Sequence, residues 1–108
     1  MKQSFVYIMS NFKRTTTYIG VTSDLERRVL EHKRDVGSKF TTKYKLKYLI
    51  YFEEISDISQ AIEREKQLKN WQKDWKRSLI KGKNPELLDL SSDWFHQDDL
   101  TDSEINSE

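Results

Sequence analysis

Two β-rich segments joined by four mainly polar residues are the feature of this sequence that most restricts its fold. The segments run over residues 5–10 and 15–22, and Asn11-Phe12-Lys13-Arg14 separates them. Short runs of β-branched and aromatic residues around such a connection are typical of an antiparallel hairpin. Gly20 lies inside the second run, which indicates a bulge or the close approach of another group. The chain is therefore expected to be built on a β-hairpin.

Helical patterns and one further strand follow the hairpin. Ser23 begins a Ser-x-x-Glu sequence, typical of a capping box, and predicts a helix over about residues 24–34. Residues 37–45 read as a basic loop, and residues 46–54 are apolar on both faces, which favours a central strand. A second cap at Asp57 opens a helix that ends near residue 70. A third helix covers about residues 72–81, with Trp71, Trp75, Ser78 and Leu79 on one face, and Asn84-Pro85 ends it.

The element order is thus β-β-α-β-α-α, which predicts an α+β fold with a three-stranded, mainly antiparallel sheet flanked by helices. Only 108 residues are available, so one domain is expected, over residues 1–90. The absence of cysteine excludes a disulfide framework, an iron–sulfur cluster and thiolate zinc sites. The apolar runs are far shorter than the roughly 20 residues that cross a bilayer. No apolar segment follows the N-terminal lysine, and we expect a cytoplasmic protein.

The net charge of +1 conceals an uneven distribution. Residues 1–90 hold all the lysines and arginines and carry a formal charge of +7, whereas residues 91–108 carry −6. A basic body favours a polyanionic partner, although an ordinary solvated surface also explains it. The acidic segment 91–108 lacks periodicity and is expected to be a mostly disordered tail.

One acidic residue lies where an apolar side chain is expected. Ile58, Ala61, Ile62 and Leu68 form a stripe at helical spacing, and Glu65 falls in the middle of it. Because an ionised carboxylate facing a core costs several kcal/mol unless it is paired or binds a metal, Glu65 requires a partner. A salt bridge to Lys69, one turn further on, is the simpler explanation, and a metal ion is the functional one.

Arg28 and His32 lie four residues apart and therefore share one face of the first helix, near the end of the Tyr18-Ile19-Gly20 strand. A single arginine at this place is typical of a solvated surface, and a single histidine more often has a structural role. The pair becomes informative together with Tyr7, Tyr18 and Glu65.

With these residues in place, the chain resembles the GIY-YIG nuclease superfamily, in particular its small stand-alone bacterial members. The resemblance covers about residues 5–90. Its signatures are Phe5-Val6-Tyr7, an intact Tyr18-Ile19-Gly20, Arg28 to His32, Ala61 to Glu65 with Lys69 after it, and Lys83-Asn84-Pro85. Each motif is weak alone, but their order and spacing together are specific. Phe5 and Val6 replace the Gly and Ile of the first signature, and the substitution affects strand packing more than chemistry because Tyr7 is kept.

The resemblance implies a metal-dependent endonuclease that hydrolyses phosphodiester bonds in DNA, with structured or repair-type DNA as candidate substrates and RNA not excluded. Glu65 would hold one Mg²⁺ or Mn²⁺ ion, which keeps most of its water ligands. Tyr18 would position and deprotonate the attacking water, and His32 would accept the proton. Arg28 would bind two phosphate oxygens and stabilise the transition state, and Tyr7 would orient the phosphate or Tyr18.

Basic residues outside this group are candidates for contacts to the nucleic-acid backbone: Lys39, Lys43, Lys45, Lys69 and the cations of the third helix. Phe40 and Tyr44 lie between the loop lysines and could stack on an unpaired base, although an ordinary solvated loop explains them equally well. Asn84 is assigned to an Asn-Pro turn and left out of the site. Two other functions remain open: a nucleic-acid-binding module with little or no turnover, and an interaction domain whose acidic tail recruits a partner or covers the basic surface.

Overall fold

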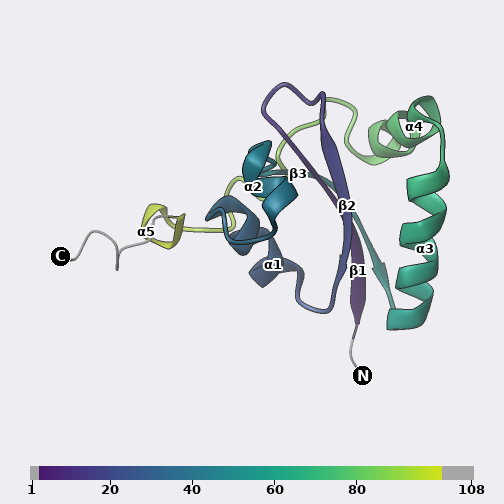
Figure 1. Cartoon of the computed structure of the whole chain (residues 1–108), viewed down its shortest axis with the longest axis horizontal. Coiled ribbons are helices and arrows are strands. Elements are labelled where there is room, and N and C mark those ends of the chain that lie inside the picture. Colours follow the sequence, from purple (N-terminus) through teal and green to yellow (C-terminus); the bar gives the residue numbers. More distant parts are fainter. Residues whose placement is uncertain (1–2, 101–108) are drawn as a thin grey trace.

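The structure, a computed structural model, describes residues 3–100. β1 (Ser4–Ser10) and β2 (Thr17–Thr22) form the expected hairpin, and β3 (Tyr48–Ile55) completes a three-stranded sheet (Figure 1). Both strand pairs are antiparallel, and the strand order is β2-β1-β3. The predicted α+β class and antiparallel sheet are confirmed.

Helices cover both faces of the sheet: α1 (Leu25–Lys33) and α2 (Lys39–Lys43) lie on one side, and α3 (Ile58–Asn70) and α4 (Lys73–Lys83) lie on the other (Figure 1). A short α5 (Gln97–Leu100) follows near the C-terminus. The basic segment 37–45, predicted as a loop, contains α2, because Ser38 accepts a hydrogen bond from the backbone of Thr41 and caps a short helix. Within residues 3–100, no helix combines the length and apolar character that a membrane span requires.

The helix caps agree with the sequence in one case and differ in the other. Asp57 caps α3, and its carboxylate accepts a hydrogen bond from the backbone N–H of Ser59. The capping box at Ser23 is wrong, since the N-cap of α1 is Asp24, which accepts from the backbone N–H of Arg27. Both residues have a side-chain oxygen that can cap a helix, so the pattern alone does not fix the register.

The position of β3 corrects a second prediction, because the central strand is β1 and not β3. β3 is apolar on both faces although it lies at an edge, since the following chain covers that edge. The backbone N–H of Leu90 donates to the carbonyl oxygen of Leu49 at 2.7 Å, and the N–H of Leu49 donates to the Asp89 carboxylate at 3.1 Å. Lys33 of α1 holds the same carboxylate at 2.8 Å.

Alternation along β1 divides the core into two parts, one on each face of the sheet. The first core lies under α3 and α4 and contains Val6, Ile8, Ile19, Ile50, Tyr51, Ala61, Leu68 and Ile80. The second core lies under α1 and contains Tyr7, Met9, Leu25, Val29, Leu46 and Leu49. In α4 the buried residue is Ile80, whereas Trp75, expected on the packed face, is 56 % exposed. Tyr7 thus faces away from α3.

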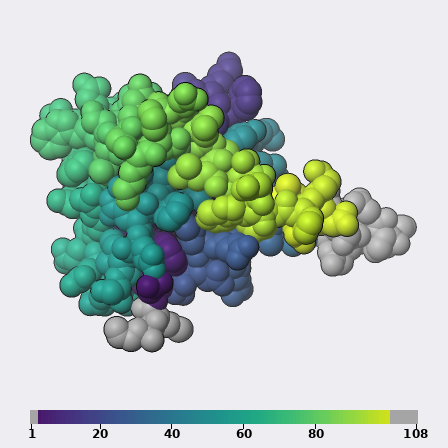
Figure 2. Space-filling model, turned by 180° about the vertical axis from the view of Figure 1, so that it is seen from behind, coloured from purple at the N-terminus to yellow at the C-terminus, as the bar shows by residue number. Residues whose placement is uncertain are grey.

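The chain after α4 runs from one core to the other around the edge of β3. Leu87 packs against the first core, and Leu90, Trp94 and Phe95 pack against the second. Figure 2 shows this segment, lime to yellow, crossing the molecule from the green α4. Ser91 is buried, so part of the acidic segment that we expected to be mostly disordered packs on the domain. The acidic residues 101–108 lie outside the described part of the chain.

Asn84 connects the end of α4 to this segment by hydrogen bonds, which supports its assignment to a structural role. Its amide nitrogen donates to the carbonyl oxygens of Ile50 and Leu88, and its oxygen accepts from the N–H of Leu88. We expect Asn84→Ala to lower the free energy of unfolding by about 2 kcal/mol, because it leaves buried polar atoms without partners. Urea denaturation measures this effect, with Asn70→Ala at the exposed end of α3 as the control. Equal effects of the two substitutions would contradict the assignment.

Candidate active site

Tyr7 lies on the central strand β1, and its ring packs over the neighbouring strand because the residue opposite it is glycine. It pairs with Gly20 of β2, and a Cβ atom on Gly20 would lie 2.6 Å from the Tyr7 hydroxyl oxygen. Of the two explanations for Gly20 that the sequence left open, the structure therefore selects the close approach of another group. The missing side chain is what allows the Tyr7 ring to lie flat across β2 toward α1.

A chain of hydrogen bonds links Tyr7 to α1 and α2. Arg28 Nε lies 3.3 Å from the Tyr7 hydroxyl oxygen, which lies 2.9 Å from His32 Nε2. On the other side of the imidazole ring, Nδ1 lies 3.1 Å from Thr41 Oγ1. Since Arg28 can only donate, the proton of Tyr7 is best satisfied by His32 Nε2 as acceptor. We therefore assign the proton of His32 to Nδ1, which donates to Thr41.

The electrostatics of this group keep both ring residues neutral at pH 7. Burial, reinforced by the charge of Arg28, lowers the pKa of His32 to about 4. Burial raises the pKa of Tyr7 to about 12, although the nearby Arg28 opposes the shift. The pKa of Arg28 is raised: burial alone would lower it, but hydrogen bonds with Glu31 and Tyr7 outweigh that effect. The arrangement is a buried phenol with a fixed cation on one side and a neutral base on the other.

The guanidinium of Arg28 has protein partners at all three nitrogens. Besides its bond to Tyr7, Nη1 donates to Glu31 Oε1 at 2.7 Å and Nη2 donates to the carbonyl oxygen of Gly37 at 3.0 Å. The side chain borders a hollow of about 150 Å³ that is also lined by Glu31 and Asp24. These three bonds use three of the five N–H groups, so a phosphate can bind the remaining two or take the place of the Glu31 carboxylate.

Tyr18 lies on β2 beside this group and begins a row of aromatic rings. Its ring centroid lies 6.4 Å from that of Tyr7, 5.7 Å from that of His32 and 6.3 Å from that of Phe40. Phe40 in turn lies 4.8 Å from Tyr44. Phe40, on α2, and Tyr44, directly after it, are both more than 40 % exposed. The row offers ring faces and edges to solvent next to the buried phenol.

Three residues that hold His32 in place are not identified from the sequence. A Cβ atom on Gly37 would collide with the His32 ring, so only glycine allows the ring to lie there. Thr41 is buried, and its hydroxyl lies 2.9 Å from that of Ser38. The sequence does contain a signal, since Gly37, Ser38 and Thr41 all lie in the small and hydroxylated part of segment 37–45.

Glu65 lies apart from the four residues just described. It is on α3, on the other side of the sheet, and its carboxylate forms an ion pair with Lys69 Nζ at 2.9 Å. The expected apolar stripe is wrong in part, because Ile58 and Ile62 are 48 % and 39 % exposed. The Glu65 side chain, 20 % exposed, lies at the edge of the packed face of α3.

The flank of α3 that carries Glu65 follows from helix geometry. Arg64 binds Glu53 of β3 through two nitrogens, at 2.9 and 2.8 Å. Successive helical residues differ by about 100°, so Glu65 emerges on the other flank, toward β2. Tyr18 belongs to the same edge strand. The sequence-predicted residues are therefore divided: Tyr7, Tyr18, Arg28 and His32 lie together, and Glu65 lies across β2 from them.

The donors suit one kind of metal site only. Within residues 3–100 no group of three or more His, Asp or Glu side chains could hold a metal ion. A single carboxylate with access to solvent is compatible with Mg²⁺ or Mn²⁺ that keeps most of its waters. Lys69 is 52 % exposed and can move away, at the low cost of a surface ion pair.

The lysines proposed to contact nucleic acid occupy two places. Lys39 and Lys43 lie on α2 and border a shallow hollow, and Lys43 Nζ lies 5.3 Å from the centre of the Tyr44 ring. Lys45 follows α2 and is exposed. These three lysines share the side of the sheet that carries the aromatic row, whereas Lys69 lies with Glu65.

Comparison with known proteins assigns the family. A model of the GIY-YIG catalytic domain matches residues 3–78. A UPF0213 protein of Syntrophus aciditrophicus is 33 % identical over 82 % of this chain and all of its own length. UPF0213 proteins of Haloquadratum walsbyi and Staphylococcus saprophyticus are 35 % and 30 % identical, over 69 % and 74 % of this chain and 83 % and 96 % of their own. No solved structure matches significantly. The chain therefore belongs to the GIY-YIG family and is similar throughout the catalytic domain to the small UPF0213 proteins.

Proposed function

We propose that the protein is a divalent-metal-dependent endonuclease that hydrolyses phosphodiester bonds in DNA, with structured or repair-type DNA as its substrate. The observation that carries the proposal is the buried chain Arg28–Tyr7–His32 beside Tyr18. The network places a cation, a phenol and a neutral imidazole in sequence. Such a set matches the requirements of phosphoryl transfer, in which a proton leaves the nucleophile while negative charge is stabilised.

In the proposed reaction, Tyr7 and His32 act together as the base. As the water oxygen forms its bond to phosphorus and the bond to the leaving oxygen breaks, the water proton passes to the Tyr7 oxygen. The Tyr7 proton moves at the same time to His32 Nε2, 2.9 Å away. Because the pKa of Tyr7 is about 12, a free phenolate is scarce at pH 7, and this coupled transfer avoids forming one.

This assignment differs from the sequence-based prediction that Tyr18 is the base. Tyr18 makes ring contacts to Tyr7 and His32, whereas the hydrogen bonds to Arg28 and His32 belong to Tyr7. We therefore assign to Tyr18 the contact with the substrate and the positioning of the water, with Phe40 and Tyr44 as its continuation. Lys39, Lys43 and Lys45 would contact backbone phosphates on the same side.

Glu65 would hold the metal ion from the other side of β2. The ion, when bound, supplies positive charge to the leaving oxygen. The ion pair with Lys69 keeps the carboxylate at the rim of α3, and release of the lysine makes it available. Arg28 stabilises charge on the phosphorane oxygens through its two remaining N–H groups or in place of Glu31.

Purified protein incubated with branched, nicked and single-stranded DNA in Mg²⁺ or Mn²⁺ tests the proposal. We expect Glu65→Gln to raise the metal concentration for half-maximal cleavage at least about tenfold, because the neutral amide is a weaker ligand for a hard cation. Glu63→Gln, on the exposed face of the same helix, is the matched control. Cleavage with the same metal dependence in both variants would overturn the role of Glu65, and absence of cleavage by the wild-type protein on every substrate would overturn the proposed activity.

One observation favours a second function, a nucleic-acid-binding module with little or no turnover. Glu65 is paired with Lys69 and lies on the other side of the sheet from Tyr7, so the carboxylate proposed to hold the metal is not beside the phenol. In that case DNA binding would weaken steeply with salt, and no product would form with any metal.

A further inference from the structure

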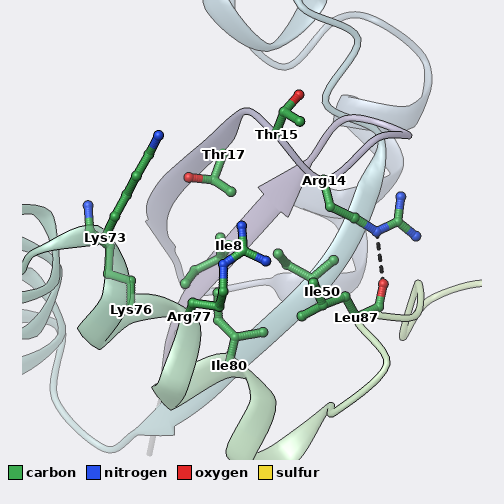
Figure 3. A pocket seen from close by; sticks show the side chains of 10 residues that line it. All are labelled: Ile8, Arg14, Thr15, Thr17, Ile50, Lys73, Lys76, Arg77, Ile80 and Leu87. Carbon is green, nitrogen blue, oxygen red and sulfur yellow. Dashed lines mark hydrogen bonds between the residues drawn. The ribbon is translucent and has the colours of Figure 1, made fainter.

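A cationic pocket lies on the side of the sheet opposite the catalytic residues. It has a volume of about 120 Å³, and Figure 3 shows its aliphatic floor with charged and hydroxyl side chains around it. The floor consists of Ile8, Ile50, Ile80 and Leu87, and the rim consists of Arg14, Thr15, Thr17, Lys73, Lys76 and Arg77. We call it the α4 pocket, because α4 supplies four of these residues.

The charges of the α4 pocket are not balanced by ion pairs in the described residues 3–100. Its rim carries four cations and no carboxylate. Arg14 is bound to the backbone, with Nε donating to the carbonyl oxygen of Leu87 at 2.8 Å. The α4 cations Lys73, Lys76 and Arg77 have no acidic partner in residues 3–100. Unpaired cations beside an aliphatic floor suit a ligand with an apolar flat part and an adjacent anion.

The α4 pocket and the catalytic residues lie back to back across β2. Thr17 and Tyr18 are consecutive residues of this strand, and successive side chains point to opposite faces. Thr17 lines the α4 pocket, whereas Tyr18 lies beside Tyr7 and His32. β2 is an edge strand, so a chain molecule can pass around it from one face to the other.

We propose that the α4 pocket holds one nucleotide of an unpaired DNA strand that bends around β2 from the catalytic residues. The base would lie on the aliphatic floor, with its phosphate on Arg77, Lys73 or Lys76 and its edge near the Thr17 hydroxyl. DNA duplex is stiff over about 150 base pairs, so a continuous helix does not follow so tight a path. The inference rests on the proposed function and specifies its substrate: DNA with a single-stranded end or flap.

The test measures fluorescence anisotropy with labelled DNA in EDTA, so that binding is observed without cleavage. We expect the full-length protein to bind a flapped duplex about tenfold more tightly than a blunt duplex of equal length. Arg77→Gln should reduce flap binding by about tenfold and lower its salt dependence by about one phosphate contact. Lys66→Gln removes the same charge from the exposed face of α3, outside the pocket, and should leave most of the affinity.

A second pair of variants distinguishes binding in the α4 pocket from a general effect of protein charge on DNA affinity. Thr17→Glu places a carboxylate among the rim cations and should abolish the preference for the flap. Gln60→Glu makes the same charge change at the exposed first turn of α3 and should preserve it. A free deoxynucleoside monophosphate serves as competitor for flap binding to the wild-type protein. If it displaces the labelled flap at the same nucleotide concentration as unlabelled flap DNA does, the ligand is the mononucleotide and not the strand. That result would overturn the path around β2.

The outcomes distinguish this inference from the proposed nuclease activity. Flap preference that disappears in Thr17→Glu supports the pocket even if no metal ion induces cleavage. Equal binding of flap and blunt duplex, or equal effects of the pocket and control substitutions, overturns the pocket even where the wild-type protein cleaves DNA. Tighter binding of an acidic peptide than of the flap would also overturn it.

Discussion

Replacement of Arg28 by alanine is expected to reduce the rate of DNA cleavage by a factor of about 10² to 10³. The range is that observed when a fixed donor to a developing negative charge is removed. Arg28 is suited to this role because its Nε position is set by Tyr7 and its Nη2 position by the Gly37 carbonyl oxygen. The rate is measured under single-turnover conditions with saturating protein, so that weaker binding does not contribute.

Arg27→Ala is the matched control for this substitution. Arg27 is the preceding residue of α1, also pairs with Glu31, at 3.3 Å, and its side chain is 76 % exposed. We expect it to retain most of the cleavage rate, because its guanidinium does not contact Tyr7. Thermal unfolding of both variants checks that the fold is kept. A folded Arg28→Ala protein that cleaves as fast as Arg27→Ala would show that the guanidinium does not act on the reaction.

The second large effect is a loss of stability in mild acid that originates from His32. Its pKa is lowered from 6.5 to about 4 in the folded protein, mainly by burial. Between these values the unfolded chain binds more protons than the folded one, so stability falls as the pH falls. The contribution is fully present above about pH 6.5, and about 3 kcal/mol of it is lost by pH 4. Urea denaturation across this range measures it.

Two substitutions isolate the contribution of His32. His32→Gln removes the titrating group, so its unfolding free energy should change little between pH 7 and pH 5, whereas the wild-type value should decline. His96→Gln removes the other histidine, which is exposed, and should follow the wild type. Burial alone would raise the pKa values of Glu53 and Asp89, but the ion pairs with Arg64 and Lys33 outweigh that effect and lower them. Parallel curves for wild type and His32→Gln would contradict burial of a neutral imidazole.

Much of the fold could be predicted because most of its helices and strands have local sequence patterns that indicate them. The hairpin, α1, α3 and α4 follow from residue type, periodicity and the Asn84-Pro85 end signal. The order of strands could not be predicted in this way. Residues 46–54 have the composition of a central strand, but their second face and outer edge are covered by Leu90 and Asp89, about 40 positions later. Such long-range coverage leaves no periodic trace in the strand itself.

The residue types of the candidate site could be predicted from the sequence, but their hydrogen-bond partners could not. Spacing on α1 brings Arg28 and His32 to one face, and the strand motifs supply Tyr7 and Tyr18. Which phenol receives the hydrogen bonds depends on Gly20 and on the path of segment 37–41, and neither is a matter of local propensity. Likewise, the helical angle of Glu65 does not reveal which side of the sheet α3 covers.

The segment from Asn84 to Phe95 links the helical layers on the two faces of the sheet, so we expect the two layers to unfold together. Leu87 packs against the core under α3 and α4, and Leu90 with Trp94 packs against the core under α1, so the segment contacts both helical layers. The same segment is tied to α1 by the ion pair between Asp89 and Lys33, the residue that follows His32. In a domain with two small cores, such a shared segment is a source of cooperative unfolding.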